Sequence, residues 1–109
     1  MYRVRETKET KWDLRNLAVY MIYSLKNGQA ARNFLAQYEK QIQNLLTFPF
    51  GYRGIGFTYQ GYEIRMKPFS TYHIFFVVDS KTHEITILRV LKDRQNWKRI
   101  LHNEEEYSF

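Results

Sequence analysis

The side chains with the most chemical capacity lie in the second half of the chain. Glu63, Arg65 and Lys67 stand at every second position, and this period-two spacing places all three on one face of a predicted strand. A carboxylate beside two cations suits a substrate phosphate and the negative charge that develops in a transition state. The alternative is a polar, solvated sheet face, which antiparallel sheets commonly have.

The histidines offer acid–base chemistry and no metal chemistry. His73, His83 and His102 are not at metal-ligand spacing and no carboxylate cluster joins them, so the sequence predicts no metal site and no cofactor. The chain has no cysteine, which excludes disulfides and thiolate metal sites. His73 can act as an acid or a base near neutral pH. The alternative is a half-buried histidine that is hydrogen-bonded at the sheet surface.

The basic residues concentrate near the C-terminus of a chain whose formal net charge is +6. Residues 86–101 contain one acid, Asp93, and a set of bases: Arg89, Lys92, Arg94, Lys98 and Arg99. Such a stretch favours an anionic partner, either a nucleic acid or an acidic protein segment. The alternative is a solvated face. Trp97 lies in the same stretch, and we favour a hydrophobic plug at the sheet edge over a contact role.

Two helices are predicted to precede these residues. The first follows from an apolar stripe at helical spacing: Leu14, Leu17, Ala18, Met21, Ile22 and Leu25. We expect it to start at Thr10 and Asp13, a capping signature, and to end at Asn27-Gly28. A second stripe contains Ala31, Phe34, Leu35, Tyr38, Ile42 and Leu45, and Phe48-Pro49 ends it. The link is so short that the two helices must be antiparallel.

The remaining pattern predicts a sheet. Residues 1–6 alternate as a short strand, and residues 50–61, which are rich in glycine, predict a loop or a short bulged strand. Residues 62–67 alternate cleanly. The apolar run 72–79 is typical of a central strand that is covered on both faces, and 84–90 should pair with it in antiparallel fashion.

This order, β-α-α-β-β-β with a short C-terminal helical element, predicts an α+β domain. A helical hairpin would pack on one face of a mainly antiparallel sheet. We predict one domain over 1–101 and an acidic tail over 102–109. We expect Glu104, Glu105 and Glu106 to be disordered; the alternative is that they fold over the basic segment.

No apolar run approaches the ~20 residues of a membrane helix, and the start of the chain is too charged for a signal peptide. We therefore expect a cytoplasmic protein without a membrane partner.

The ordered set of marks resembles the RelE/ParE toxins of type II toxin–antitoxin systems along nearly the whole chain. The marks are Asp13-Leu14 with Tyr20, Ala30-Ala31, Leu45 with Phe48-Pro49, Ile64-Arg65, the strand Tyr72–Asp79, and the segment Ile85–Leu91 with Asp93-Arg94 and Trp97. The resemblance implies a partner antitoxin whose segment wraps the hairpin and sheet. For that contact the apolar stripes offer Leu14, Leu17, Met21, Phe34 and Tyr38.

The resemblance leaves the target open, because function depends on the site rather than on the fold. A ParE-like toxin would inhibit DNA gyrase, arrest growth and be no enzyme, and it would bind through Arg89, Lys92, Arg94 and Trp97. A RelE-like toxin would cut messenger RNA in the ribosome without a metal, through Arg65, Lys67, His73 and Arg94. The third hypothesis is an inactive homologue that only binds a partner.

The ParE-like hypothesis is favoured by two departures from the ribonuclease pattern. RelE-like nucleases resemble one another in a catalytic arginine on the central strand, where this chain has His73. They carry a tyrosine or histidine near the C-terminus for the final proton transfer, where this chain offers Trp97. An indole donates one N–H and does not titrate usefully, so it is a poor general acid.

Overall fold

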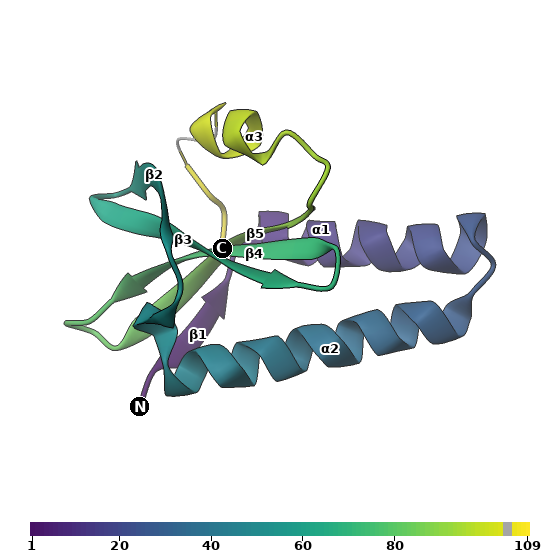
Figure 1. The fold of residues 1–109 in the computed structure, drawn as a ribbon, viewed down its shortest axis with the longest axis horizontal. Helices are drawn as coiled ribbons and strands as arrows, with labels where there is room; N and C mark the ends of the chain where they lie inside the picture. Colours follow the sequence, from purple (N-terminus) through teal and green to yellow (C-terminus); the bar gives the residue numbers. More distant parts are fainter. Residues whose placement is uncertain (104–105) are drawn as a thin grey trace.

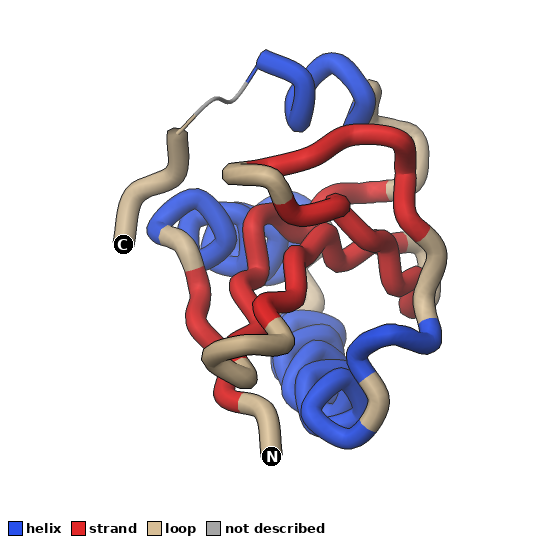
Figure 2. Tube along the Cα trace, turned by 90° about the vertical axis from the view of Figure 1, so that its left-hand side faces the viewer, coloured by secondary structure: helices blue, strands red, loops and turns tan. Residues whose placement is uncertain are grey.

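The structure, a computed structural model, describes residues 1–103 and 106–109. Its centre is a five-stranded sheet in the order β1-β5-β4-β3-β2. Helices α1 and α2 pack on one face of this sheet and the short helix α3 on the other (Figures 1 and 2). The strands are β1 (Arg3–Glu6), β2 (Gly54–Tyr59), β3 (Tyr62–Phe69), β4 (Tyr72–Asp79) and β5 (Glu84–Lys92). The helices are α1 (Lys8–Val19), α2 (Gly28–Thr47) and α3 (Trp97–Asn103).

The predicted α+β architecture is confirmed. The two long helices form the expected hairpin, and the central strands pair in antiparallel fashion. Strand β1 instead pairs in parallel with β5, from Arg3 opposite Glu84 to Glu6 opposite Ile87. The N-terminal strand therefore lies beside the last strand of the sheet. The segment predicted as a loop or a bulged strand is β2, whose register with β3 shifts between Gly54 and Thr58.

The predicted start of the first helix is wrong by one turn. Helix α1 begins at Lys8, and its N-cap is Thr7, whose hydroxyl accepts a hydrogen bond from the Thr10 N–H. Thr10 and Asp13 therefore lie inside the helix rather than at its start. Their side chains bond to β5, so the capping signature reflected a tertiary contact and not a helix end.

The predicted role of Asn27-Gly28 is also wrong. The first helix continues after Val19 as a π-helical segment, Tyr20–Ser24, and the left-handed residue that follows it is Lys26, with φ 52°. Asn27 instead caps the second helix, because its side-chain oxygen accepts a hydrogen bond from the Ala30 N–H. Asparagine suits both positions by sequence, since it accepts left-handed backbone and is a strong N-cap.

Side chains of α1 satisfy the edge of β5 where β1 ends. The register of β4 with β5 shifts between Phe75 and Phe76, which leaves Leu88 as an extra, bulged residue. The hydroxyl of Thr7 donates to the Leu88 carbonyl at 2.9 Å, and that of Thr10 donates to the Ile87 carbonyl at 3.0 Å. Asp13 accepts the Val90 N–H at 3.0 Å. The backbone groups of β5 that β1 leaves unpaired at the bulge thus find hydrogen-bond partners on the first helix and its N-cap.

The sheet separates two apolar cores. The helix-side core contains Phe34 and Leu45 of α2 with Ile74 and Phe76 of β4. The opposite core contains Phe75 and Val77 of β4 together with Leu101 of α3. Both faces of β4 are therefore buried, as its continuous apolar sequence predicts.

The end of the tail returns to the domain. Tyr107 is buried in the second core, with its ring 5.1 Å from the Tyr59 ring. The Ser108 carbonyl accepts the Lys8 N–H at 2.7 Å, and the Phe109 ring lies 3.5 Å from the Arg5 guanidinium carbon. Of the three residues expected to be disordered, Glu104 and Glu105 lie outside the described residues, and Glu106 is exposed.

Candidate functional site

The sheet places the predicted catalytic residues on two different faces. Lys67 pairs directly with Ile74, and Arg65 pairs with Phe76, so both cations share the helix-side face. His73 lies next to Ile74 on β4 and therefore points to the opposite face. Arg65 and Lys67 are thus together, whereas His73 is separated from them by the thickness of the sheet.

Arg65 and Lys67 hold the segment that follows α2 against the sheet. Arg65 donates from Nη1 to the Tyr52 carbonyl at 2.7 Å, and its guanidinium lies 5.2 Å from the Phe50 ring. The Lys67 ammonium lies 4.7 Å from the Tyr52 ring centroid, and only 6% of the residue is exposed. Both cations are occupied by aromatic and backbone partners. The aromatic residues Phe50 and Tyr52 are thereby anchored to the sheet.

Glu63 is the only carboxylate that the described residues bring to this pair of cations. Its Oε2 lies 3.9 Å from the Arg65 Nη2, and its side chain is half exposed. An ion pair of this length and exposure contributes little to stability. The predicted cluster of Glu63, Arg65 and Lys67 therefore exists, but it is built around packing contacts with Tyr52.

His73 lies partly buried at the end of the second core. Its ring meets the Phe75 ring edge-on at 6.1 Å, and its Nδ1 is buried without a hydrogen-bond partner among the described residues. Burial lowers the pKa of His73 below its ordinary value of 6.5, with Asp93 opposing the shift and Arg53 adding to it. The imidazole is therefore held towards its neutral form, and the surface hydrogen bond considered from the sequence is not made by Nδ1.

Arg89 is occupied by Asp13 of α1. Its Nε and Nη2 donate to the two carboxylate oxygens at 2.7 and 2.8 Å, and both side chains are largely buried. This two-point pairing fixes α1 on β5. Arg89 therefore serves the fold, although the sequence grouped it with the exposed cations of the C-terminal segment.

Lys92, Arg94 and Trp97 lie on the turn that leads from β5 into α3. Lys92 and Arg94 are exposed, and neither forms an ion pair within residues 1–103 and 106–109. The Asp93 N–H donates to the Thr71 carbonyl, which ties this turn to the β3–β4 turn. Trp97 packs 5.4 Å from Phe75 in the second core, as a hydrophobic plug would.

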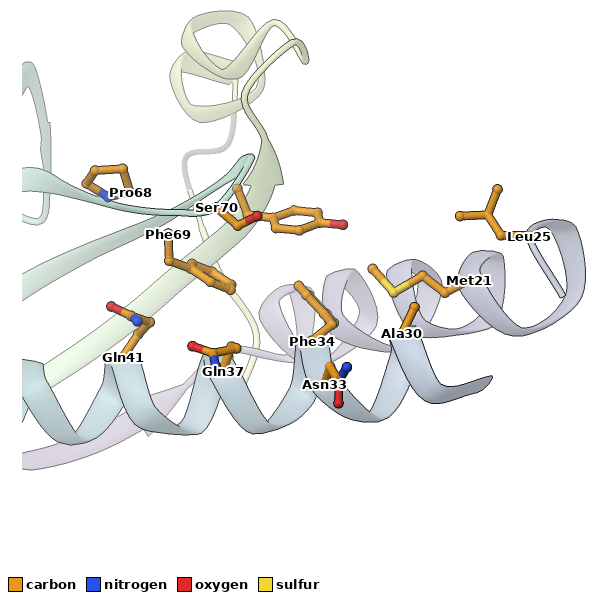
Figure 3. Close-up of a pocket in the computed structure, with 11 residues that line it drawn as sticks. Met21, Leu25, Ala30, Asn33, Phe34, Gln37, Gln41, Pro68, Phe69 and Ser70 are labelled. Carbon is orange, nitrogen blue, oxygen red and sulfur yellow. The ribbon is translucent and has the colours of Figure 1, made fainter. Parts of the chain in front are cut away.

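The two long helices and the β3–β4 turn enclose an apolar groove of about 640 Å³ (Figure 3). Met21 and Phe34 line it, whereas Leu14, Leu17 and Tyr38, which were grouped with them, pack into the helix-side core. Tyr38 is buried, and its hydroxyl donates to Glu6. Burial raises the pKa of Tyr38, and the Glu6 carboxylate raises it further.

Sequence reasoning missed a row of amides on the wall of this groove. Asn33, Gln37 and Gln41 follow one another along α2 at intervals of four residues (Figure 3). No charged side chain is among the described residues that line the groove. The four-residue spacing was visible in the sequence, but only the β3–β4 turn opposite makes it one wall of a groove.

Within the described part of the chain, no three histidine, aspartate or glutamate side chains gather where a metal ion could bind. In the same residues, no helix has the length and apolar character needed to cross a bilayer. The geometry thus defines a small α+β protein with an uncharged groove on its helical side and an exposed cationic turn beside the second core.

The comparisons with known proteins agree with this class. A family model described as the ParE toxin of the type II toxin–antitoxin system parDE matches residues 4–97. Among solved structures, the chain is similar to one titled "Chromosomal ParDE TA system from P. aeruginosa", with TM-score 0.67 and 19% identity over 84% of this chain and 96% of that chain. No match was found among curated proteins. The chain belongs to the ParE toxin family.

Proposed function

We propose that this chain is a toxin that inhibits DNA gyrase by binding it, and that a cognate antitoxin neutralises the toxin. The observation that carries the proposal is the division of the candidate catalytic residues between two sheet faces. An acid–base pair must reach one reacting group within hydrogen-bond distance. His73 on one face and Lys67 on the other do not meet that requirement, which favours a binding toxin over a ribonuclease.

The exposed turn is the proposed contact with the target. Lys92 and Arg94 are free of carboxylate partners among the described residues, so they can attract an acidic surface without first breaking an ion pair. Trp97 fixes this turn by packing in the second core, and the β3–β4 turn fixes it through a backbone hydrogen bond. Arg89 is left out of the contact because Asp13 already binds it.

The groove is the proposed antitoxin site. Residues four apart on a helix are about 6 Å apart along its axis, and two residues of an extended chain span about 6.6 Å. Asn33, Gln37 and Gln41 could therefore bond to the backbone of an extended segment at every second residue. Phe34 and Phe69 would receive its apolar side chains.

The central test compares two activities of the purified chain. We expect it to block DNA supercoiling by gyrase and to leave messenger RNA intact in a translating lysate. Messenger cleavage with unaffected supercoiling would replace the proposal with the ribonuclease. If expression of the chain without an antitoxin causes no growth defect, the chain is an inactive homologue.

A charge reversal tests the contact surface. Lys92→Glu with Arg94→Glu should weaken gyrase inhibition about tenfold or more, because two attractive charges become repulsive. Lys40→Glu, which changes an exposed cation on α2, is the matched control and should retain full inhibition. Equal loss in both variants would mean that overall charge, and not this turn, matters.

A further inference from the structure

The outward face of α1, together with the π-helical segment that continues it, carries an apolar stripe that the fold does not use. Trp12 is 66% exposed, Val19 41% and Tyr23 73%. These residues lie opposite the side of the helix that buries Ala18 and Met21. Solvent-facing positions of a surface helix are ordinarily polar, so three exposed apolar residues in register indicate a contact surface.

The shape of this face fits one side chain of a second helix. Trp12, Arg15, Asn16 and Val19 surround a shallow hollow of about 350 Å³. These positions are i, i+3, i+4 and i+7, the four residues that form a hole for a knob when two helices pack together. Tyr23, in the π-helical segment, lies four residues further along the chain and extends the stripe.

The charge on this face is mainly positive. Glu9 accepts the Ser108 N–H at 2.9 Å, and Asp13 is bound by Arg89, so the two acids of α1 are used inside the molecule. Lys8, Lys11 and Arg15 are exposed and form no ion pair within the described residues. The stripe thus lies beside an excess of cations, Lys8, Lys11 and Arg15 against the Glu9 carboxylate, in contrast to the uncharged groove.

We propose that the outward face of α1 docks an acidic amphipathic helix of another chain. An apolar side chain of that helix would fill the hollow beside Trp12, and its carboxylates would meet Lys8, Lys11 and Arg15. The face from Lys8 to Tyr23 is about 24 Å long, which matches a partner helix of about 16 residues. The surface does not depend on the target or on the antitoxin groove proposed above.

Two other occupants fit less well. A second copy of this chain would bring a face with the same excess of cations, so the two faces would repel each other. A single nucleic-acid strand would need aromatic rings close enough to stack on neighbouring bases, but Trp12 and Tyr23 are about 16 Å apart along the helix. Val19, which lies between them, has no ring.

The test uses a pair of stapled helical peptides of about 16 residues that share a leucine stripe. One carries glutamates beside the stripe and the other carries lysines at the same positions. We expect the glutamate peptide to bind the full chain and the lysine peptide to bind at least about tenfold more weakly. Trp12→Ala with Tyr23→Ala should weaken binding about tenfold or more, and Lys11→Glu with Arg15→Glu should reverse the preference.

Phe48→Ala is the matched control, because Phe48 is also 66% exposed but lies at the end of α2. This variant should bind the glutamate peptide as the unaltered chain does, and circular dichroism should show the same helix content in all variants.

Equal binding of both peptides, no binding, or equal effects of the Trp12 and Phe48 changes would overturn the proposal. Two further outcomes would overturn it: self-association of the chain that Trp12→Ala abolishes, and binding of oligothymidine, but not of the peptide, that Trp12→Ala abolishes. None of these measurements involves gyrase, so their failure is distinguishable from failure of the proposed toxin activity.

Discussion

At the scale of single residues, the neighbours of a cation decide its role. Arg65, Arg89 and Arg94 are the same residue type, and the sequence assigned all three to function. The structure gives Arg65 a carbonyl and a ring, gives Arg89 a carboxylate, and leaves Arg94 exposed on a turn. A charge that is already satisfied inside the protein is costly to redirect to a ligand, so Arg94 is the best candidate of the three.

His73 should make the protein less stable in mild acid. Burial lowers the pKa of His73 below 6.5 in the folded state, so the His73 side chain binds a proton more readily in the unfolded chain. The free energy of unfolding should therefore fall as the pH drops through and below that ordinary value. We expect urea unfolding at about pH 7.5 and about pH 5.5 to show this fall, and His73→Gln to show a smaller one.

The exposed His102 provides the control for this prediction. His102→Gln should keep the difference in stability that the unaltered chain shows between the two pH values. If His73→Gln changes nothing while His102→Gln removes the difference, the assignment of the acid sensitivity to His73 is wrong.

At the scale of elements, the contact between α1 and β5 decides the helix boundaries. Strand β1 pairs with β5 only as far as Ile87, and the bulge at Leu88 would leave backbone groups without partners. The first two turns of α1 supply those partners through Thr7, Thr10 and Asp13. Their polar side chains are therefore matched to a strand about eighty positions later in the sequence, and not to their own helix.

Thr7 should contribute more to stability than its size suggests. Thr7→Val keeps the shape of the side chain but removes both the helix cap and the bond to the Leu88 carbonyl. We expect a loss of about 2–3 kcal/mol in the free energy of unfolding, measured by urea denaturation. Thr47→Val, an exposed position near the end of α2, should change stability by less than about 0.5 kcal/mol. Similar losses in the two variants would contradict the proposed role of the edge contact.

At the scale of the whole molecule, the sheet has two cores and the C-terminus closes the second. Tyr107 lies buried beside Tyr59, and Ser108 bonds to the first turn of α1. The last residues therefore contact both β1, through Arg5, and β2, through Tyr59, and these two strands lie at opposite ends of the sheet order. This closure covers apolar surface that a small domain needs to bury.

Tyr107→Ala should therefore destabilise the entire domain and not only its end. We expect a loss of about 3 kcal/mol, because a large buried ring is removed from a packed core. Phe109→Ala, which removes a half-exposed ring from Arg5, should cost less than about 1 kcal/mol. A thermal unfolding series of the two variants makes the comparison, and an unchanged midpoint for Tyr107→Ala would show that the closure is dispensable.

The sequence by itself determined the order of the elements and most of the buried face of the two long helices, although Ile22, Leu25 and Leu35 of the predicted stripes are exposed. The stripes at helical spacing predicted the two long helices, and the apolar run of β4 predicted burial on both sides, because these patterns follow from local geometry. It also showed the family resemblance. It did not determine helix ends, since Thr10, Asp13 and Asn27 suit a cap as well as the contacts they make.

Only the tertiary structure decided which polar residues meet. Whether Lys67 and His73 share a site depends on strand register, and moving the register by one residue turns a side chain to the other face. The pairing of Asp13 with Arg89 and the return of Tyr107 join residues far apart in the chain. Such contacts form because buried polar and apolar groups need partners, and periodicity within one segment does not specify a partner in another.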